Sequence, residues 1–122
     1  MKALLSIKPE FASAIFDGAK RYEFRRTIFR APVKVVVVYV SSPVCHVAGE
    51  FDVKTIIYDS VRSLWQRTRD EAGINRTAFF RYFEGRAYGY GVEIGAVRLY
   101  ERPLDLREHF GVNPPQSFVY LT

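Results

Sequence analysis

The most chemically suggestive group in the sequence is a lysine, a glutamate and an arginine within six positions. Lys20 follows an apolar segment that ends at Gly18, and Glu23 and Arg25 take alternate positions just after it. Since successive side chains of a strand point to opposite faces, Glu23 and Arg25 would share one face beside Lys20. In a cleft without water, Lys20 could act as a general base or donate to a phosphate, and Glu23 could accept from the amino group of a base.

The charged neighbours of Lys20 would act in opposite directions on its pKa, because Arg25 would lower it and Glu23 would raise it. In open solvent the same residues would form an ion pair of little energetic value. Arg25 is a better cleft candidate than Arg26, since the two point to opposite faces of a regular strand.

Three further polar side chains are candidates for the same site. Lys8 precedes Pro9 and would line the mouth of the cleft from the other side. Ser41 and Ser42 end a long apolar run and could offer hydroxyls to a phosphate. Turn chemistry alone also explains serines before Pro43, so both interpretations stay open.

Cys45 and His46 form a pair of reactive residue types, but neighbours on a strand point apart. The only other histidine, His109, is distant in the sequence. A single cysteine excludes an intramolecular disulfide and a multi-cysteine zinc site. The sequence therefore predicts neither a metal nor a cofactor.

The composition favours a nucleic-acid partner. The chain has 122 residues, a net charge of +5, and thirteen arginines against five lysines. Arginine presents a planar fork that fits phosphates and stacks on bases. We expect RNA or a nucleotide as ligand, with DNA as the alternative, while the oligomeric state stays open.

The length and hydropathy predict a single cytoplasmic domain over residues 1–122. Hydrophobic residues make up 48% of the chain, which suits a globular protein with a core. No apolar run approaches the roughly 18 residues that span a bilayer, and the N-terminus has no signal peptide, so no membrane partner is expected.

Hydrophobic periodicity predicts an α+β protein. An alternating pattern places Tyr22 and Phe24 towards the core, and Gly49 marks a bulge that re-aims Glu50. Ser63 begins a capping box. Strands are expected at residues 2–7, 21–26, 33–40, 47–58, 86–100 and 114–121, and helices at 9–17, 64–72, 76–84 and 105–110. The strand at 33–40 would be buried on both faces, and so many short strands suit a curled, closed sheet.

Two other patterns have competing interpretations. Tyr88 and Tyr90 alternate with glycines that would let a helix or ligand approach closely. The tyrosines could stack bases, but barrel core is the favoured interpretation. Six arginines between residues 62 and 86 would form either a phosphate-tracking patch or a solvated face.

Several segments resemble the ASCH family. The N-terminal match is Ser6-Ile7-Lys8-Pro9, a short helix, and then Gly18-x-Lys20 with Glu23 and Arg25 on the next strand. The segments 39–43, 49–51, 80–85 and 114–118 resemble a subgroup described as predicted transcriptional regulators. The resemblance implies a small PUA-like β-barrel with short peripheral helices, a cleft beside the first helix, and RNA binding.

Some ASCH proteins are described as hydrolases, which implies alternatives to simple binding. One type removes the acetyl group of N4-acetylcytidine, and another is a ribonuclease. In the former, a lysine after the helix acts with a threonine on the next strand and a distant glutamate. Lys20 matches that lysine, whereas Glu23 stands in place of the threonine.

The leading hypothesis is a module that binds RNA, a nucleotide or a modified base near Lys20, Glu23 and Arg25. The first alternative is a hydrolase of an acylated nucleoside or of RNA, in which Lys20 acts with Glu23 or Glu50. The second alternative is a transcription-linked regulatory module.

Overall fold

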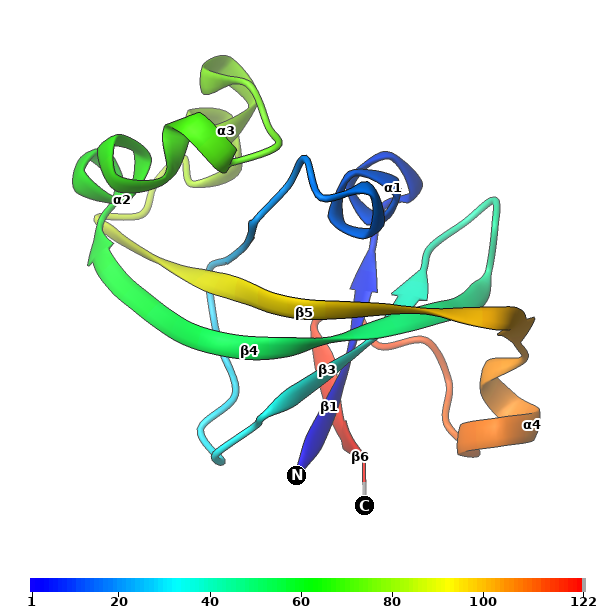
Figure 1. Cartoon of the computed structure of the whole chain (residues 1–122). Helices are drawn as coiled ribbons and strands as arrows, with labels where there is room; N and C mark the ends of the chain where they lie inside the picture. Colours follow the sequence, from blue (N-terminus) through cyan, green and yellow to red (C-terminus); the bar gives the residue numbers. More distant parts are fainter. Residues whose placement is uncertain (122) are drawn as a thin grey trace.

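The structure, a computed structural model, describes residues 1–121 and confirms an α+β fold (Figure 1). The helices at 61–68 and 76–82 lie at one end of two long strands, the helix at 9–17 lies over their middle, and the helix at 106–110 lies near the other end. The elements are β1 (Lys2–Ile7), α1 (Pro9–Asp17), β2 (Tyr22–Arg25), β3 (Val35–Val40), β4 (His46–Ser60), α2 (Val61–Thr68), the 3₁₀ turn η1 (Arg69–Glu71), α3 (Arg76–Tyr82), β5 (Tyr88–Leu104), α4 (Leu106–Phe110) and β6 (Phe118–Leu121).

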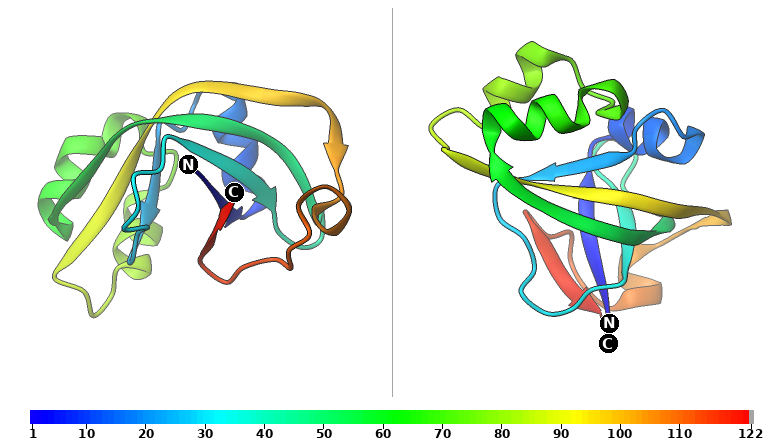
Figure 2. Two further views of the ribbon diagram at one scale, coloured as in Figure 1. Left: turned by 90° about the horizontal axis from the view of Figure 1, so that it is seen from below. Right: turned by 60° about the vertical axis from the view of Figure 1, so that its left-hand side comes forward.

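The strands form one mixed sheet in the order β2-β5-β4-β3-β1-β6. β1 and β3 pair in parallel, and the other neighbours are antiparallel. Figure 2 shows that β4 and β5 curve strongly, so the sheet curls around its own core. No helix within residues 1–121 has the length and apolarity needed to cross a membrane.

The predicted closure into a barrel is not observed, because no strand ladder joins β2 to β6 among the described residues. Side chains bridge this opening instead. Arg25 Nη2 on β2 donates to the carbonyl of Ser6 on β1 at 3.1 Å. The Tyr120 hydroxyl on β6 accepts from the backbone N–H groups of Arg30 and Ala31. β2 has only four residues, and irregular chain follows it.

The predicted central strand is confirmed, since β3 is buried on both faces. Its residues alternate between two hydrophobic clusters, as the period of two requires. Val36 and Val38 pack in the cluster that includes Ile15 of α1, and Val37 packs with Leu106 of α4. The first helix is also as predicted, with Pro9 in its first turn and a left-handed Gly18 at its end.

The first helix of the insert between β4 and β5 begins earlier than predicted. Ser60 caps it by accepting from the N–H of Ser63, so the capping box at Ser63 was wrong. The helix ends at Thr68, before a 3₁₀ turn, rather than at Gly73. The reason is that β4 runs directly into the helix. The predicted cap of the next helix, Asn75, is confirmed by its bond from Ala78.

The glycines that alternate with tyrosines on β5 make room for the insert, the helices at 61–82 between β4 and β5, and the tyrosines do not fill a barrel core. A Cβ on Gly89 would lie 2.4 Å from a ring carbon of Phe83, and one on Gly91 would lie 3.1 Å from Leu64. The glycines therefore let the insert pack onto this face of β5. Tyr88 takes the opposite face and is 53% exposed, so its expected place in the core was wrong.

A methyl group at Gly89 tests this close packing. We expect Gly89→Ala to lower the free energy of unfolding by about 1–3 kcal/mol, because the Phe83 ring is buried and has little room to move. Denaturant unfolding of the single variant and of the Gly89→Ala/Phe83→Leu pair would measure it. The smaller Leu should recover part of the loss, and a Gly89→Ala variant of wild-type stability would contradict the packing described.

Candidate functional site

A cavity of about 320 Å³ opens beside α1. Residues distant in the sequence meet there, namely the end of β1, the start of α1, β2, the insert and the segment before β6. Its polar lining includes Lys8, Lys20, Glu23, Arg25, Arg26 and Gln116. Four of the six residues predicted for the site are therefore brought together at one cavity.

Lys20 is the most completely buried charged residue of this lining, with 2% of its surface exposed. Its Nζ donates to the carbonyl of Ala72 at 2.6 Å and lies 4.9 Å from the ring centroids of Phe11 and Phe24. Burial lowers the pKa of Lys20 to about 8, and Glu23 acts in the opposite direction. A lysine in this state can exchange a proton near neutral pH.

Glu23 is buried on β2 beside this lysine. Burial raises the pKa of its carboxyl group, while the charges of Arg25 and Lys20 oppose that rise. The charge of Glu23 acts to raise the pKa of Lys20, the direction expected from the sequence. Burial, rather than Arg25, is the cause that lowers the pKa of Lys20.

Arg25 holds the parts of the cavity together. Its Nε lies 3.2 Å from Glu23 Oε2, a close contact of opposite charges that is not an aligned hydrogen bond. Its Nη2 donates to the carbonyl of Ser6 and lies 3.5 Å from that of Ser117. One guanidinium therefore connects β2, β1 and the segment that leads into β6, and fixes the position of the Glu23 carboxylate.

Lys8 is among the residues that line the cavity. It is the N-cap residue of α1 and is exposed. Ser41 and Ser42 are not among the residues that line the cavity. Residues 41–44 form a turn in which the N–H of Val44 donates to the carbonyl of Ser41 at 3.2 Å, which fits the turn interpretation of this segment.

Glu50, the second carboxylate considered for Lys20, also lies outside the cavity lining. It accepts hydrogen bonds from Arg98 Nε at 2.9 Å and from the Tyr100 hydroxyl at 2.8 Å. Burial acts to raise the pKa of Glu50, but these hydrogen bonds outweigh it and hold the pKa below its usual value. The predicted bulge is present, because β4 shifts register against β3 next to Gly49. The bulge lies beside Glu50 and its hydrogen-bonded partners Arg98 and Tyr100, and not beside the cavity.

Some cavity residues were missed from the sequence. Phe11 of α1 lines the cavity, and its ring lies against the ammonium group of Lys20. Tyr82 and Gln116 lie in segments that resemble the ASCH subgroup, but nothing local assigned them to the site, because the fold brings them to the cavity from distant positions. Among residues 1–121, no three His, Cys, Asp or Glu side chains are grouped so as to share a metal ion.

The shifted pKa of Lys20 predicts a pH-dependent stability. Between about 8 and 10.5 the unfolded chain holds a proton on Lys20 that the folded protein has released. Folding therefore becomes more favourable as the pH rises through this window. Between these pH values the free energy of unfolding of wild type should rise by on the order of 3 kcal/mol relative to that of Lys20→Met, since a tenfold change in proton affinity is worth about 1.4 kcal/mol.

Urea unfolding of both proteins at several pH values measures this difference. Lys34→Met, which removes an exposed lysine, is the control for loss of a charge. A constant difference between wild type and Lys20→Met from pH 7 to 11 would contradict the burial of a titrating amine.

Comparison with known proteins identifies the family. The ASCH domain model matches residues 5–110. The chain is 32% identical over 127 residues to an ASCH domain-containing ribonuclease of Zymomonas mobilis, covering 98% of this chain and 84% of that protein. The crystal structure of the Zymomonas mobilis ASCH protein superposes with a TM-score of 0.91 at 32% identity, over 99% of this chain and 87% of that one.

Two relatives from Ureaplasma parvum are much longer. The chain is 35% identical to a protein named ATP synthase subunit alpha, matching 97% of this chain but only 15% of that one. It is 29% identical to a protein named large ribosomal subunit protein uL22, again over 97% of this chain and 38% of the other. A place among transcriptional regulators finds no support in these relatives. The family model and the ribonuclease together show that this chain belongs to the ASCH domain family and has its PUA-like α+β fold.

Proposed function

We propose that the protein cleaves RNA at the cavity lined by Lys20, Glu23 and Arg25. The observation that carries the proposal is a buried lysine with a lowered pKa beside a buried glutamate with a raised one. Pairs of groups whose environments move their pKa values towards neutrality are typical of general acid–base catalysis. Similarity over nearly the whole chain to an ASCH domain-containing ribonuclease supports RNA as the substrate.

Cleavage would use the 2′-hydroxyl of the substrate itself. Glu23 would take the proton of that hydroxyl as its oxygen bonds to phosphorus. The bond from phosphorus to the 5′-oxygen would break, and Lys20 would protonate the departing oxygen. The products would be a 2′,3′-cyclic phosphate and a free 5′-hydroxyl. Lys8, which also lines the cavity, would stabilise the charge on the phosphoryl oxygens.

Arg25 would act as a positioning residue in this reaction. It contacts Glu23 and two backbone carbonyls, so most of its donors are directed at the protein. Its role would be to hold the carboxylate in place and to limit the rise of the Glu23 pKa. A carboxylate held in this way could accept the proton of the 2′-hydroxyl.

A second candidate function is recognition of a base or nucleotide without turnover. It is favoured by the enclosure of Lys20, whose ammonium group already donates to Ala72. In such a site Glu23 would accept from the amino group of a base. Glu23→Gln would then change base preference more than overall affinity. Hydrolysis of N4-acetylcytidine is less favoured, since Glu23 replaces the hydroxyl residue of that type.

Substitution of Lys20 separates cleavage from binding. We expect Lys20→Ala to lose RNA cleavage, by at least the roughly hundredfold that a general acid contributes. End-labelled RNA resolved on a denaturing gel would measure this, with Lys34→Ala as the charge-matched control and circular dichroism to verify folding. Undiminished cleavage by a folded Lys20→Ala variant would refute the catalytic role. Salt-sensitive binding with no cleavage by wild type would favour the recognition site.

The pH dependence of cleavage provides an independent test. The value of kcat/KM should fall at low pH as Glu23 gains a proton, and fall again above about pH 8 as Lys20 loses its proton. Lys20→Arg should lose cleavage at every pH, because arginine keeps its proton and cannot give it to the departing oxygen. A single 2′-O-methyl group at the cleaved nucleotide should block that cut. Persistent cutting there would rule out attack by the 2′-oxygen.

A further inference from the structure

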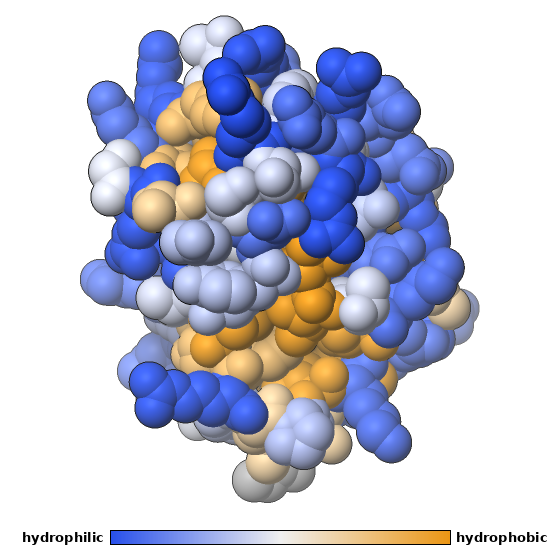
Figure 3. All heavy atoms as spheres, turned by 90° about the vertical axis from the view of Figure 1, so that its left-hand side faces the viewer, coloured by the Kyte–Doolittle hydropathy of each residue, from blue (hydrophilic) through white to orange (hydrophobic). Residues whose placement is uncertain are grey.

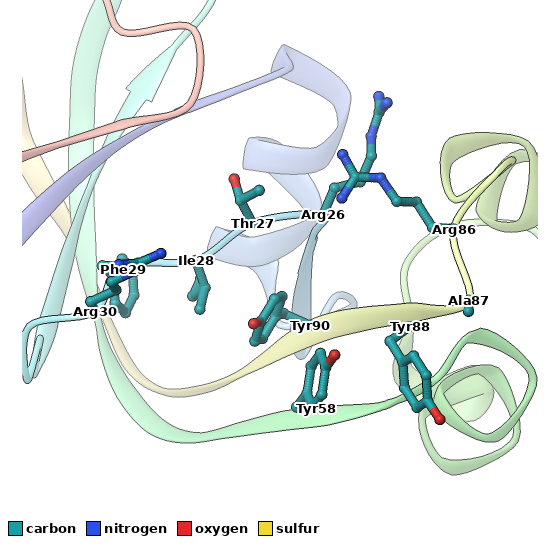
Figure 4. A pocket seen from close by; sticks show the side chains of 10 residues that line it. All are labelled: Arg26, Thr27, Ile28, Phe29, Arg30, Tyr58, Arg86, Ala87, Tyr88 and Tyr90. Atoms are coloured by element: carbon teal, nitrogen blue, oxygen red, sulfur yellow. The ribbon is translucent and has the colours of Figure 1, made fainter.

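A second hollow lies outside the site described above. It is bordered by the end of β4, the start of β5 and the chain that follows β2. It has a volume of about 690 Å³. Figure 4 shows three tyrosine rings in a row along β4 and β5, with arginine side chains at its border. The face of the molecule in Figure 3 carries an apolar strip with hydrophilic side chains on both sides.

The three tyrosines form a ladder, defined here as Tyr58, Tyr88 and Tyr90. Tyr58 and Tyr90 are directly paired across the strands, with ring centroids 4.7 Å apart. Tyr58 and Tyr88 are stacked at 5.4 Å with an angle of 22° between the rings. Tyr58 is 59% exposed, although rings of this size usually contribute to a core. Because the glycines of β5 face the insert, the ladder faces solvent.

Three arginines border the ladder without a protein partner of opposite charge. Arg26, Arg30 and Arg86 are exposed and line the hollow together with the tyrosines. Within residues 1–121 none of them lies within ion-pair distance of a carboxylate, and no Asp or Glu is in the lining. Arg67 and Arg98, by contrast, are both paired. The three guanidinium groups are therefore available to an anionic ligand.

The ladder is continuous with the cavity of Lys20. Arg26 lines both hollows, and it also lines a third of about 300 Å³ between them, together with Arg25 and Arg86. Arg26 also lies over the ring of Tyr82 at 4.8 Å, which positions it at this junction. A chain of nucleotides could therefore run from the ladder, past Arg26 and Arg86, to Lys20.

We propose that the tyrosine ladder and its three arginines form a subsite for single-stranded RNA that flanks the nucleotide in the Lys20 cavity. The proposal rests on RNA being the ligand there, and it adds how a polymer is held. Every base has a face that stacks on an aromatic ring, whereas a duplex already stacks its bases on one another. The arginines would neutralise the phosphates between stacked bases. The subsite therefore selects unpaired chains of several nucleotides over single nucleotides and over duplex.

Binding of an uncleavable probe tests the subsite separately from catalysis. The probe is a fluorescein-labelled, single-stranded octamer of 2′-O-methyl RNA, and the readout is fluorescence anisotropy. Tyr58→Ala and Tyr88→Ala should each weaken binding roughly 5- to 150-fold, the range that alanine substitution of a stacking aromatic gives. Tyr58→Phe and Tyr88→Phe keep the rings and should bind as wild type does. A matching DNA octamer should show the same losses, because stacking does not read the 2′-hydroxyl.

The phosphate contacts are tested by the salt dependence of the same binding. Arg86→Ala should reduce the slope of log K against log salt by about 0.7, the value for one phosphate of a single strand. Arg102→Ala removes an exposed arginine near the opposite end of β5 and should leave the slope unchanged.

The outcomes separate the two proposals. Loss of octamer binding in the alanine variants, with no RNA cleavage by wild type, would support the subsite and refute the ribonuclease. Cleavage that depends on Lys20, with octamer binding unchanged in Tyr58→Ala and Tyr88→Ala, would refute the subsite alone. Equal affinity for duplex and single strand would also overturn it. So would unchanged octamer binding in every variant, since the exposed rings would then serve a different partner, such as a protein.

Discussion

The contacts of Arg25 across the open side of the sheet are the interactions on which the site depends. β2 pairs only with β5, and no ladder joins it to β6 among the described residues. The Arg25 guanidinium spans this opening by reaching the carbonyls of Ser6 and Ser117. Arginine suits this position because its fork donates in several fixed directions at once. The opening that a closed barrel would fill with hydrogen bonds is here left as a cavity, and Arg25 sets its shape.

Burial along this opening gives the residues of the site their chemical character. Lys20 lies against the rings of Phe11 and Phe24, so water is largely excluded from its ammonium group. The charge of Glu23 limits the fall of the Lys20 pKa, and Arg25 and Lys20 together limit the rise of the Glu23 pKa. The cluster is thus mutually dependent. Removing one member leaves another buried charge less compensated, which is costly in a low-dielectric site.

Local signals in the sequence were sufficient for part of the fold and of the site. Pro9 and Gly18 bound α1, and the period of two placed Glu23 and Arg25 on one strand. What required the tertiary structure was long-range, such as the bond from Lys20 to Ala72, 52 positions away. The alternation of tyrosine and glycine on β5 predicted that the two residue types lie on opposite faces of the strand. It did not predict which face the helices would cover. Closure failed as a prediction because it requires β2 and β6, which are far apart in the sequence, to pair with each other, and periodicity does not encode which strands pair.

Direct titration of Lys20 tests the central claim that burial against an opposing carboxylate controls this site. Carbon-13 labelling of the lysines would allow NMR to follow the Cε resonance of Lys20 with pH, assigned by its loss in Lys20→Met. A midpoint near 8 is expected in wild type, and a lower one in Glu23→Gln, where the charge that raises the pKa is gone. A midpoint near 10.5 in both proteins would show that Lys20 is solvated, and would contradict the account.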